Sequence, residues 1–119
     1  MMENTMKTRQ IPRTEWTGFF DELSKKLEGK SVALEVFGPE IGDQVEERQM
    51  FFAGLTADVT DKAGKQDQIE IMLGGNPSAH LTHLITAPIE VDLQQTELGV
   101  ASALQIKAAD GTTSLLRLS

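Results

Sequence analysis

Cysteine is absent from this chain of 119 residues, and so are long apolar runs. Without cysteine there is no disulfide, no thiolate zinc site and no cysteine nucleophile, which fits a reducing cytoplasm. No run could cross a bilayer, and residues 1–10 lack the apolar core of a secretory signal. Basic side chains are few, 11 against 18 acidic ones, and the net charge of −7 repels phosphate backbones and anionic membranes. We therefore expect a cytoplasmic protein, with neither nucleic acid nor membrane as partner.

The chain is long enough to bury one core, and its charges divide it into two parts. Residues 1–13 carry Lys7, Arg9 and Arg13 against Glu3, a net of +2, whereas residues 30–60 carry two basic and six acidic side chains, a net of −4. We expect an N-terminal arm, residues 1–13, and a single α+β domain, residues 14–119. The arm is either a frayed terminus or a segment that docks on the acidic face of a neighbouring subunit.

One amphipathic helix is predicted directly after the arm. Pro12 favours an extended approach, Thr14 is a suitable N-cap, and Gly29 is suited to the position after the helix end. Apolar side chains recur at helical spacing between these two points and form a single stripe: Trp16, Phe19, Phe20, Leu23 and Leu27. This stripe predicts a helix that packs on a core.

The chain after residue 30 reads as β structure. Val32, Leu34 and Val36 alternate with other residues in a strand that stops at a Gly-Pro turn. A second strand, residues 45–60, is apolar on both faces near Phe51, and Gly54 is where it can bend. On the parity that we assign to the core lie Phe51, Ala53, Leu55, Ala57 and Val59, with Met50 and Phe52 on the opposite one.

A short strand with Ile69, Ile71 and Leu73 precedes the longest alternating segment, residues 81–93. Its odd positions other than His83 are apolar, namely Leu81, Ile85, Ala87, Ile89, Val91 and Leu93, whereas Pro88 lies on the outward parity and indicates an edge, a bulge or a sharp bend. A closing hairpin, residues 103–108 and 112–118, follows. A three-residue turn at residues 109–111 aligns Leu104 with Leu116, and we prefer it because it keeps the apolar side chains on one face.

These elements predict an α+β fold. We expect an N-terminal amphipathic helix followed by a five- to six-stranded, strongly bent, mostly antiparallel sheet that is small and barrel-like. The architecture is similar to that of the Sm-like and SH3-like barrels. Neither of the characteristic Sm motifs occurs in the later strands, so this likeness concerns architecture alone.

Several motifs occur in an order that resembles a bacterial family of small proteins classed as a domain of unknown function. The motifs cover nearly the whole chain: IPR at residues 11–13 with Trp16, Phe19 and Phe20; LEV at 34–36 with Gly38, Pro39, Ile41 and Gly42; HLTH at 80–83 with Ile85 and Pro88; and DGTT at 110–113 with LLR at 115–117. The resemblance implies a bacterial, cytoplasmic protein whose role is uncharacterised.

His80 and His83 are the candidate residues for a metal or small-molecule site. On a strand, residues three apart point to opposite faces, so a shared ion requires a coiled chain at residues 79–82. The alternative is structural, with His83 as a neutral core residue that is hydrogen-bonded to a backbone or threonine partner. Thr82 and Thr86 lie nearby, and carboxylates available to complete a site are Asp58, Asp61, Asp67, Glu90 and Asp92. We expect no cofactor.

Motifs of common enzymes are missing, since there is no P-loop, no GxGxxG and no GxSxG. We therefore favour a protein that is not an enzyme: an interaction module that forms a homo-oligomer. The reason is an apolar surplus at Met50, Phe52 and Phe37, which one helix cannot easily cover. Two alternatives stay open. One is an enzyme or metal site around His80 and His83, and the other is an Sm-like nucleic-acid binder that gathers Lys7, Arg9, Arg13, Lys25, Lys26 and Lys30 on one face.

Overall fold

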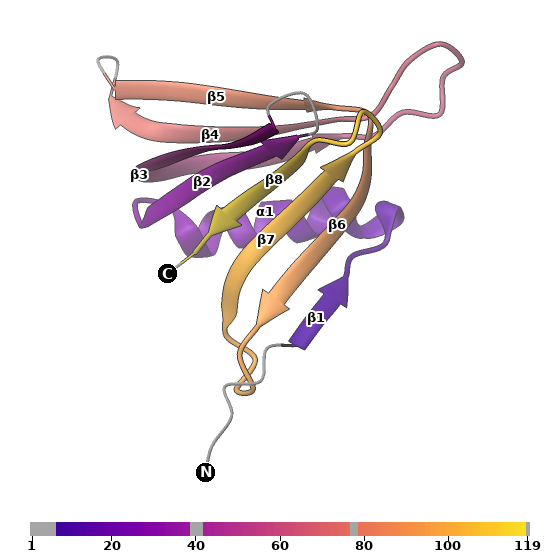
Figure 1. Ribbon diagram of the computed structural model, residues 1–119. Coiled ribbons are helices and arrows are strands. Elements are labelled where there is room, and N and C mark those ends of the chain that lie inside the picture. The colour runs from indigo at the N-terminus through magenta and orange to yellow at the C-terminus, as the bar shows by residue number, and fades with distance from the viewer. Residues whose placement is uncertain (1–6, 39–41, 77–78, 119) are drawn as a thin grey trace.

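The structure, a computed structural model, describes residues 7–38, 42–76 and 79–118. Eight strands form one antiparallel sheet in the order β1-β6-β7-β8-β2-β3-β4-β5. In chain order the elements are β1 (Lys7–Gln10), a 3-10 turn (Arg13–Glu15), α1 (Trp16–Leu27), β2 (Ser31–Gly38), β3 (Gly42–Asp58), β4 (Gln68–Asn76), β5 (Ala79–Thr86), β6 (Pro88–Gln95), β7 (Ala101–Ala108) and β8 (Thr113–Arg117). The sheet curls, and α1 lies along its concave side (Figure 1).

The expected fold class is right in its mixture of one helix with a bent antiparallel sheet, and wrong in three details. The described residues hold eight strands rather than five or six, a strand precedes the helix, and the sheet stays open instead of closing into a barrel. Closure requires the two end strands to pair, but in the part of the chain that the structure describes β1 pairs only with β6 and β5 only with β4. The sheet therefore has two distinct edges among the described residues.

The first strand comes from the arm and carries no apolar periodicity that could reveal it. All four side chains of β1 are exposed, and its pairing with β6, from Lys7 opposite Gln95 to Gln10 opposite Asp92, is a long-range contact. Ile11 follows, is buried, and donates its backbone N–H to the carbonyl of Val91 at 2.8 Å. The strand thus leads the chain from the sheet edge into the core.

The helix follows the predicted stripe. Trp16, Phe20, Leu23 and Leu27 are buried, and the indole N–H of Trp16 donates to the carbonyl of Ile11 at 2.9 Å. The expected cap at residue 14 is wrong, because a 3-10 turn precedes the helix and the N-cap position is held by residue 15 without a side-chain hydrogen bond. No helix in the described residues is long and apolar enough to span a membrane.

The bend of β3 occurs where it is predicted, at Gly54, but it reverses the parity assigned to the phenylalanines. The register against β4 shifts between Phe52 and Gly54, so Phe52 and Leu55 both face the core. Phe51 is left 61% exposed. The helix satisfies the backbone at this bulge, since the hydroxyl of Ser24 accepts from the N–H of Leu55 at 3.0 Å and donates to its carbonyl at 3.1 Å.

The long alternating segment is two strands that meet at a corner. Ala87 has φ +55, a conformation rare for a residue other than glycine, and turns the chain from β5 into β6. The predicted parity therefore fails locally: Pro88 is buried, Ile89 is 63% exposed, and a register shift between Pro88 and Glu90 restores the pattern. The bend expected at the proline is confirmed, one residue earlier in the chain.

The closing hairpin has the predicted three-residue turn. Gly111 has φ +92, and Leu104 lies opposite Leu116. The same row continues across the sheet to Leu34 on β2 and Leu93 on β6. These four leucines are buried and form a continuous band on the concave face, against which the helix side of the core packs.

Candidate functional site

The two histidines lie on opposite faces of β5, as the strand periodicity predicts. His80 is exposed, and its Nε2 atom is 3.3 Å from the hydroxyl of Thr82. His83 faces the concave side, where its Nε2 atom is 2.9 Å from the hydroxyl of Ser114 on β8. Because the two rings bind different partners on different faces, the structure does not bring them to one ion.

His83 and Ser114 are residue types that serve as base and nucleophile in hydrolases, but this serine is not accessible to a substrate. Ser114 is buried, so its hydroxyl cannot reach a substrate carbonyl without rearrangement of β8. His83 also has an interaction beyond this hydrogen bond. The arrangement fits a structural contact that joins β5 to β8 across the concave side of the sheet.

The candidate carboxylates are dispersed over separate partners. Asp67 and Asp61 bind Arg13, and Glu90 binds Lys107 with 3.7 Å between the charged atoms. Asp58 lies at the end of β3, and the pairing of the strands places it away from both histidines. Within residues 7–38, 42–76 and 79–118 no group of three or more histidines and carboxylates could hold a metal ion.

Arg13 ties the end of the arm to the loop between β3 and β4. Its Nε and Nη2 atoms donate to the two carboxylate oxygens of Asp67 at 2.6 and 3.0 Å, and Nη2 also donates to the carbonyl of Thr60 at 2.9 Å. Asp67 in turn accepts from the backbone N–H of Thr60 at 3.0 Å. The hydrogen bond from Arg13 holds the pKa of the Asp67 carboxyl below its usual range. This contact fixes the loop against the helix side of the fold.

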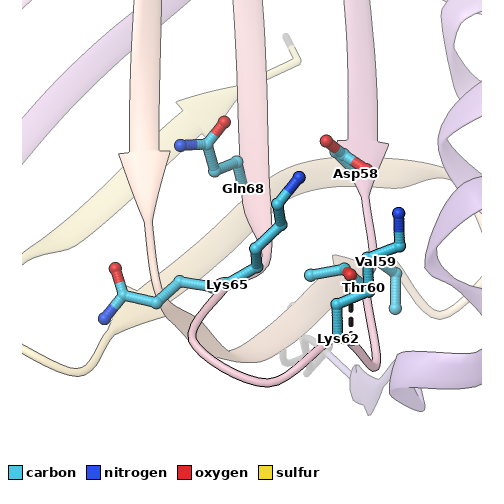
Figure 2. Close-up of a pocket in the computed structure, with 7 residues that line it drawn as sticks. Asp58, Val59, Thr60, Lys62, Lys65 and Gln68 are labelled. Carbon is cyan, nitrogen blue, oxygen red and sulfur yellow. Dashed lines mark hydrogen bonds between the residues drawn. The ribbon is translucent and has the colours of Figure 1, made fainter.

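The same loop encloses a polar pocket of about 520 Å³ at the ends of β3 and β4 (Figure 2). The side chain of Lys65 extends from the loop toward the strand ends that carry Asp58 and Gln68, and Lys62 lies on the opposite arm of the loop. The described lining contains no histidine, serine or cysteine. It offers hydrogen bonds and charges of both signs.

A pair of carboxyl groups on the convex face is the most perturbed acid pair in the described chain. Glu90 and Asp92 are two residues apart on β6 and share a face of the strand. Asp92 is only 7% exposed, and burial, together with the hydrogen bond to Glu90 and its charge, raises the pKa of Asp92 to about 6. The hydrogen bond from Asp92 lowers the pKa of Glu90. The i, i+2 spacing of Glu90 and Asp92 on a strand is a signal in the sequence that the two carboxyl groups lie on one face. The sequence holds no signal for the burial of Asp92.

The two edges of the sheet differ in length and in charge. β1 has four residues and carries Lys7 and Arg9, whereas β5 has eight residues, AHLTHLIT, with no lysine, arginine, aspartate or glutamate. Figure 1 shows β5 at the outer margin of the curled sheet. On its convex face β5 exposes His80, Thr82 and Leu84, the last of them 48% exposed. A long, uncharged edge of this kind is a template for pairing with another strand.

The expected apolar surplus is present on other residues than those named from the sequence. The bulge at Gly54 turns Phe52 into the core. Met50 is half-buried and packs against the core. The large apolar side chains that the described surface exposes are instead Phe51, Leu84, Ile89, Leu98 and Val100. Leu84 is the member of this set that lies on the free edge strand.

Comparisons with known proteins give a family without an activity. A family described as "Family of unknown function (DUF5335)" matches residues 7–119. Among curated proteins, an uncharacterized protein of Aquifex aeolicus (strain VF5) is 34% identical over 113 residues, which cover 95% of this chain and 93% of that protein. No solved structure matches the chain.

Proposed function

Because the chain belongs to DUF5335, a family of unknown function, we propose its function from the surface of the molecule. The protein is an interaction module rather than an enzyme, and it self-associates by pairing β5 with β5 of a second copy. The observation that carries this proposal is the unguarded edge: eight residues of extended chain without a charged lysine, arginine or carboxylate.

Main-chain hydrogen bonds supply the affinity in this mode of association. An edge strand leaves every second residue's N–H and C=O groups unpaired, and two antiparallel strands of eight residues can form about eight hydrogen bonds with each other. A two-fold axis between the copies makes the interface self-complementary, because the same strand faces itself. The two sheets then join into one continuous sheet.

Side chains on the convex face add to the pairing and set its specificity. Thr82 and Leu84 project from the same face, so the two-fold axis brings the corresponding side chains of the two copies close together. The net charge of −7 opposes association of two identical chains, but none of that charge lies on the pairing strand. We expect salt to strengthen the dimer by screening the remaining repulsion.

Matched threonine-to-lysine substitutions test the proposal. Thr82→Lys places a positive charge on the edge strand, whereas Thr56→Lys makes the same change on β3, an inner strand, on the same convex face and at a site that is also exposed. Like charges that face each other across an interface cost several kcal/mol, so Thr82→Lys weakens association by about tenfold or more. Light scattering across micromolar concentrations measures the mass. A monomer of 13.0 kDa for the unsubstituted protein refutes the proposal, and so does equal loss in both variants.

The nucleic-acid alternative has less support, because one of the cations that it needs is already neutralised. Arg13 binds Asp67 and Asp61, and the helix lysines Lys25 and Lys26 are exposed on a chain whose net charge is −7. Salt-dependent retention on RNA would restore this alternative. The enzyme or metal alternative needs a site that His80 and His83 do not share, since their rings lie on opposite faces of β5 and contact different side chains.

A further inference from the structure

A groove of about 350 Å³ opens between the helix and the tip of the β6–β7 hairpin, on the opposite edge of the sheet from β5. One wall is a stripe of α1 at positions 19, 22, 23 and 26, and the other wall is the hairpin at positions 93, 95 and 99–101. β1 contributes Arg9 to the lining. Three separate elements therefore converge on one opening, and its volume lies in the range of small-molecule sites.

The apolar side chains that line part of the groove, which we call its floor, are continuous with the core. Leu23 from the helix and Leu93 from β6 are buried beneath it, and Val100 stands 60% exposed at the mouth. Phe19 is half-buried, and its ring packs against the buried ring of Phe20 with 5.8 Å between the centroids. The apolar part of a ligand in the groove would thus contact side chains that the core already holds in position, so little ordering is needed on binding.

Two cations line the groove without a carboxylate partner among the described residues. Arg9 lies opposite Leu93 on the concave face, and its guanidinium sits 5.8 Å from the centroid of the Phe19 ring. Lys26 is exposed one helical turn beyond Glu22, yet no ion pair joins these two within the described chain. Arg9 and Lys26 against the single acid Glu22 give the groove a local charge of +1, in a protein whose total is −7.

We propose that this groove binds a carboxylate-bearing amphiphile, such as a medium-chain acyl carboxylate, with its chain on the apolar floor and its anionic end between Arg9 and Lys26. The guanidinium offers a carboxylate two parallel N–H donors. A neutral alcohol of the same chain length gains only the apolar contact, and an ammonium meets repulsion. This charge preference distinguishes the carboxylate from other occupants of the groove.

The proposal is tested by titrating the isotopically labelled full chain with octanoate, 1-octanol and octylammonium, and following the amide resonances by NMR. We expect octanoate to shift the amides of Gly99, Val100 and Ala101, and to bind about tenfold more tightly than octanol. Octylammonium should bind more weakly still. Equal affinity for octanoate and octanol overturns the proposal, as does a response confined to the polar pocket at residues 58–68.

Charge-neutral variants locate the anionic end. Arg9→Gln and Lys26→Gln each weaken octanoate binding by about threefold or more, whereas Lys25→Gln, the adjacent exposed lysine outside the groove, leaves the affinity unchanged. Lys26→Gln keeps the test valid if loss of Arg9 perturbs β1. Unchanged affinity in both groove variants refutes the proposal. If Lys26→Gln instead shifts the monomer–dimer equilibrium without changing octanoate binding, the groove is an interface between copies and the proposal fails.

Discussion

Asp92 on β6 gives the sharpest test of the electrostatics of this sheet. Its carboxyl lies on the convex face between Gln10 and Gln105 of the neighbouring strands, and only 7% of the residue is exposed. Glutamines cannot neutralise a carboxylate, and the charge of Glu90 adds repulsion that the attraction of Lys107 only partly offsets. Asp92→Asn keeps the shape of the side chain, removes the charge, and can still donate a hydrogen bond to Glu90. We expect this substitution to stabilise the folded protein at pH 8.

The magnitude follows from the pKa of Asp92, which is raised from 3.8 to about 6 in the folded protein. The folded state therefore holds this proton more tightly than the unfolded chain, and the free energy of unfolding falls as the pH rises through the window from about 4 to 6. Each tenfold change in proton affinity is worth about 1.4 kcal/mol, so the ionised carboxylate costs at most about 3 kcal/mol above pH 6. Asp92→Asn should gain about 1–3 kcal/mol at pH 8 and nothing at pH 4.

Urea unfolding at pH 4, 6 and 8 measures this difference, with the fluorescence of Trp16, the single tryptophan and a buried one, as the probe. Asp21→Asn, at an exposed position on the helix, is the control and should change the free energy of unfolding little at any of these pH values. A variant at position 92 that is less stable than the parent protein at pH 8 contradicts the reasoning. An equal gain at pH 4 and pH 8 contradicts it as well, because the effect would then not depend on ionisation.

Three further predictions concern the core and the contacts by which Arg13 holds the loop between β3 and β4. Leu104→Ala, in the middle of the leucine band, should lower the free energy of unfolding by about 2–5 kcal/mol in urea, and a loss below 1 kcal/mol would mean that the band is not closely packed. Trp16→Phe removes a buried hydrogen bond and should cost about 1–3 kcal/mol by circular dichroism; no loss would show that the indole N–H is dispensable. Arg13→Gln should speed proteolysis between residues 60 and 67, while Lys25→Gln should not, and equal cleavage rates would show that the Arg13–Asp67 contact does not order the loop.

The parts of the fold that the sequence predicts are those with a local periodic signal. The helix is visible because Trp16, Phe20 and Leu23 repeat at its own period, and the closing hairpin because only one turn length keeps Leu104 and Leu116 on the same face. The bend at Gly54 is visible for a similar reason, since the apolar residues around it cannot all face one side of a straight strand.

The parts that escape prediction depend on contacts between distant residues. β1 is four polar residues whose only structural signal is their pairing with β6. Pro88 indicates a bend in this segment, but the exact place of the corner, at Ala87, is hidden because the period of two continues through it in the sequence. Its backbone is held by hydrogen bonds with residues 67 and 109. The exposure of Phe51 in place of Phe52 follows from the exact position of the bulge. No local pattern reports such positions.

The candidate site divides in the same way. The opposite directions of His80 and His83 follow from strand periodicity alone, and the structure agrees. Ser114 as the partner of His83, and Asp67 as the partner of Arg13, join residues far apart in the chain and become evident only when the sheet is assembled. That β5 is a free edge depends on the whole strand order, and so could not be foreseen from its own residues.

Hydrogen exchange measured over a range of protein concentrations tests the proposed strand pairing most directly. Amides of β5, Ala79–Thr86, whose N–H groups point away from β4, should exchange more slowly as the concentration rises, while those of β1, Lys7–Gln10, should not change. Exchange in β5 that is independent of concentration, or protection that develops only at residues 96–101, would contradict self-association through this edge.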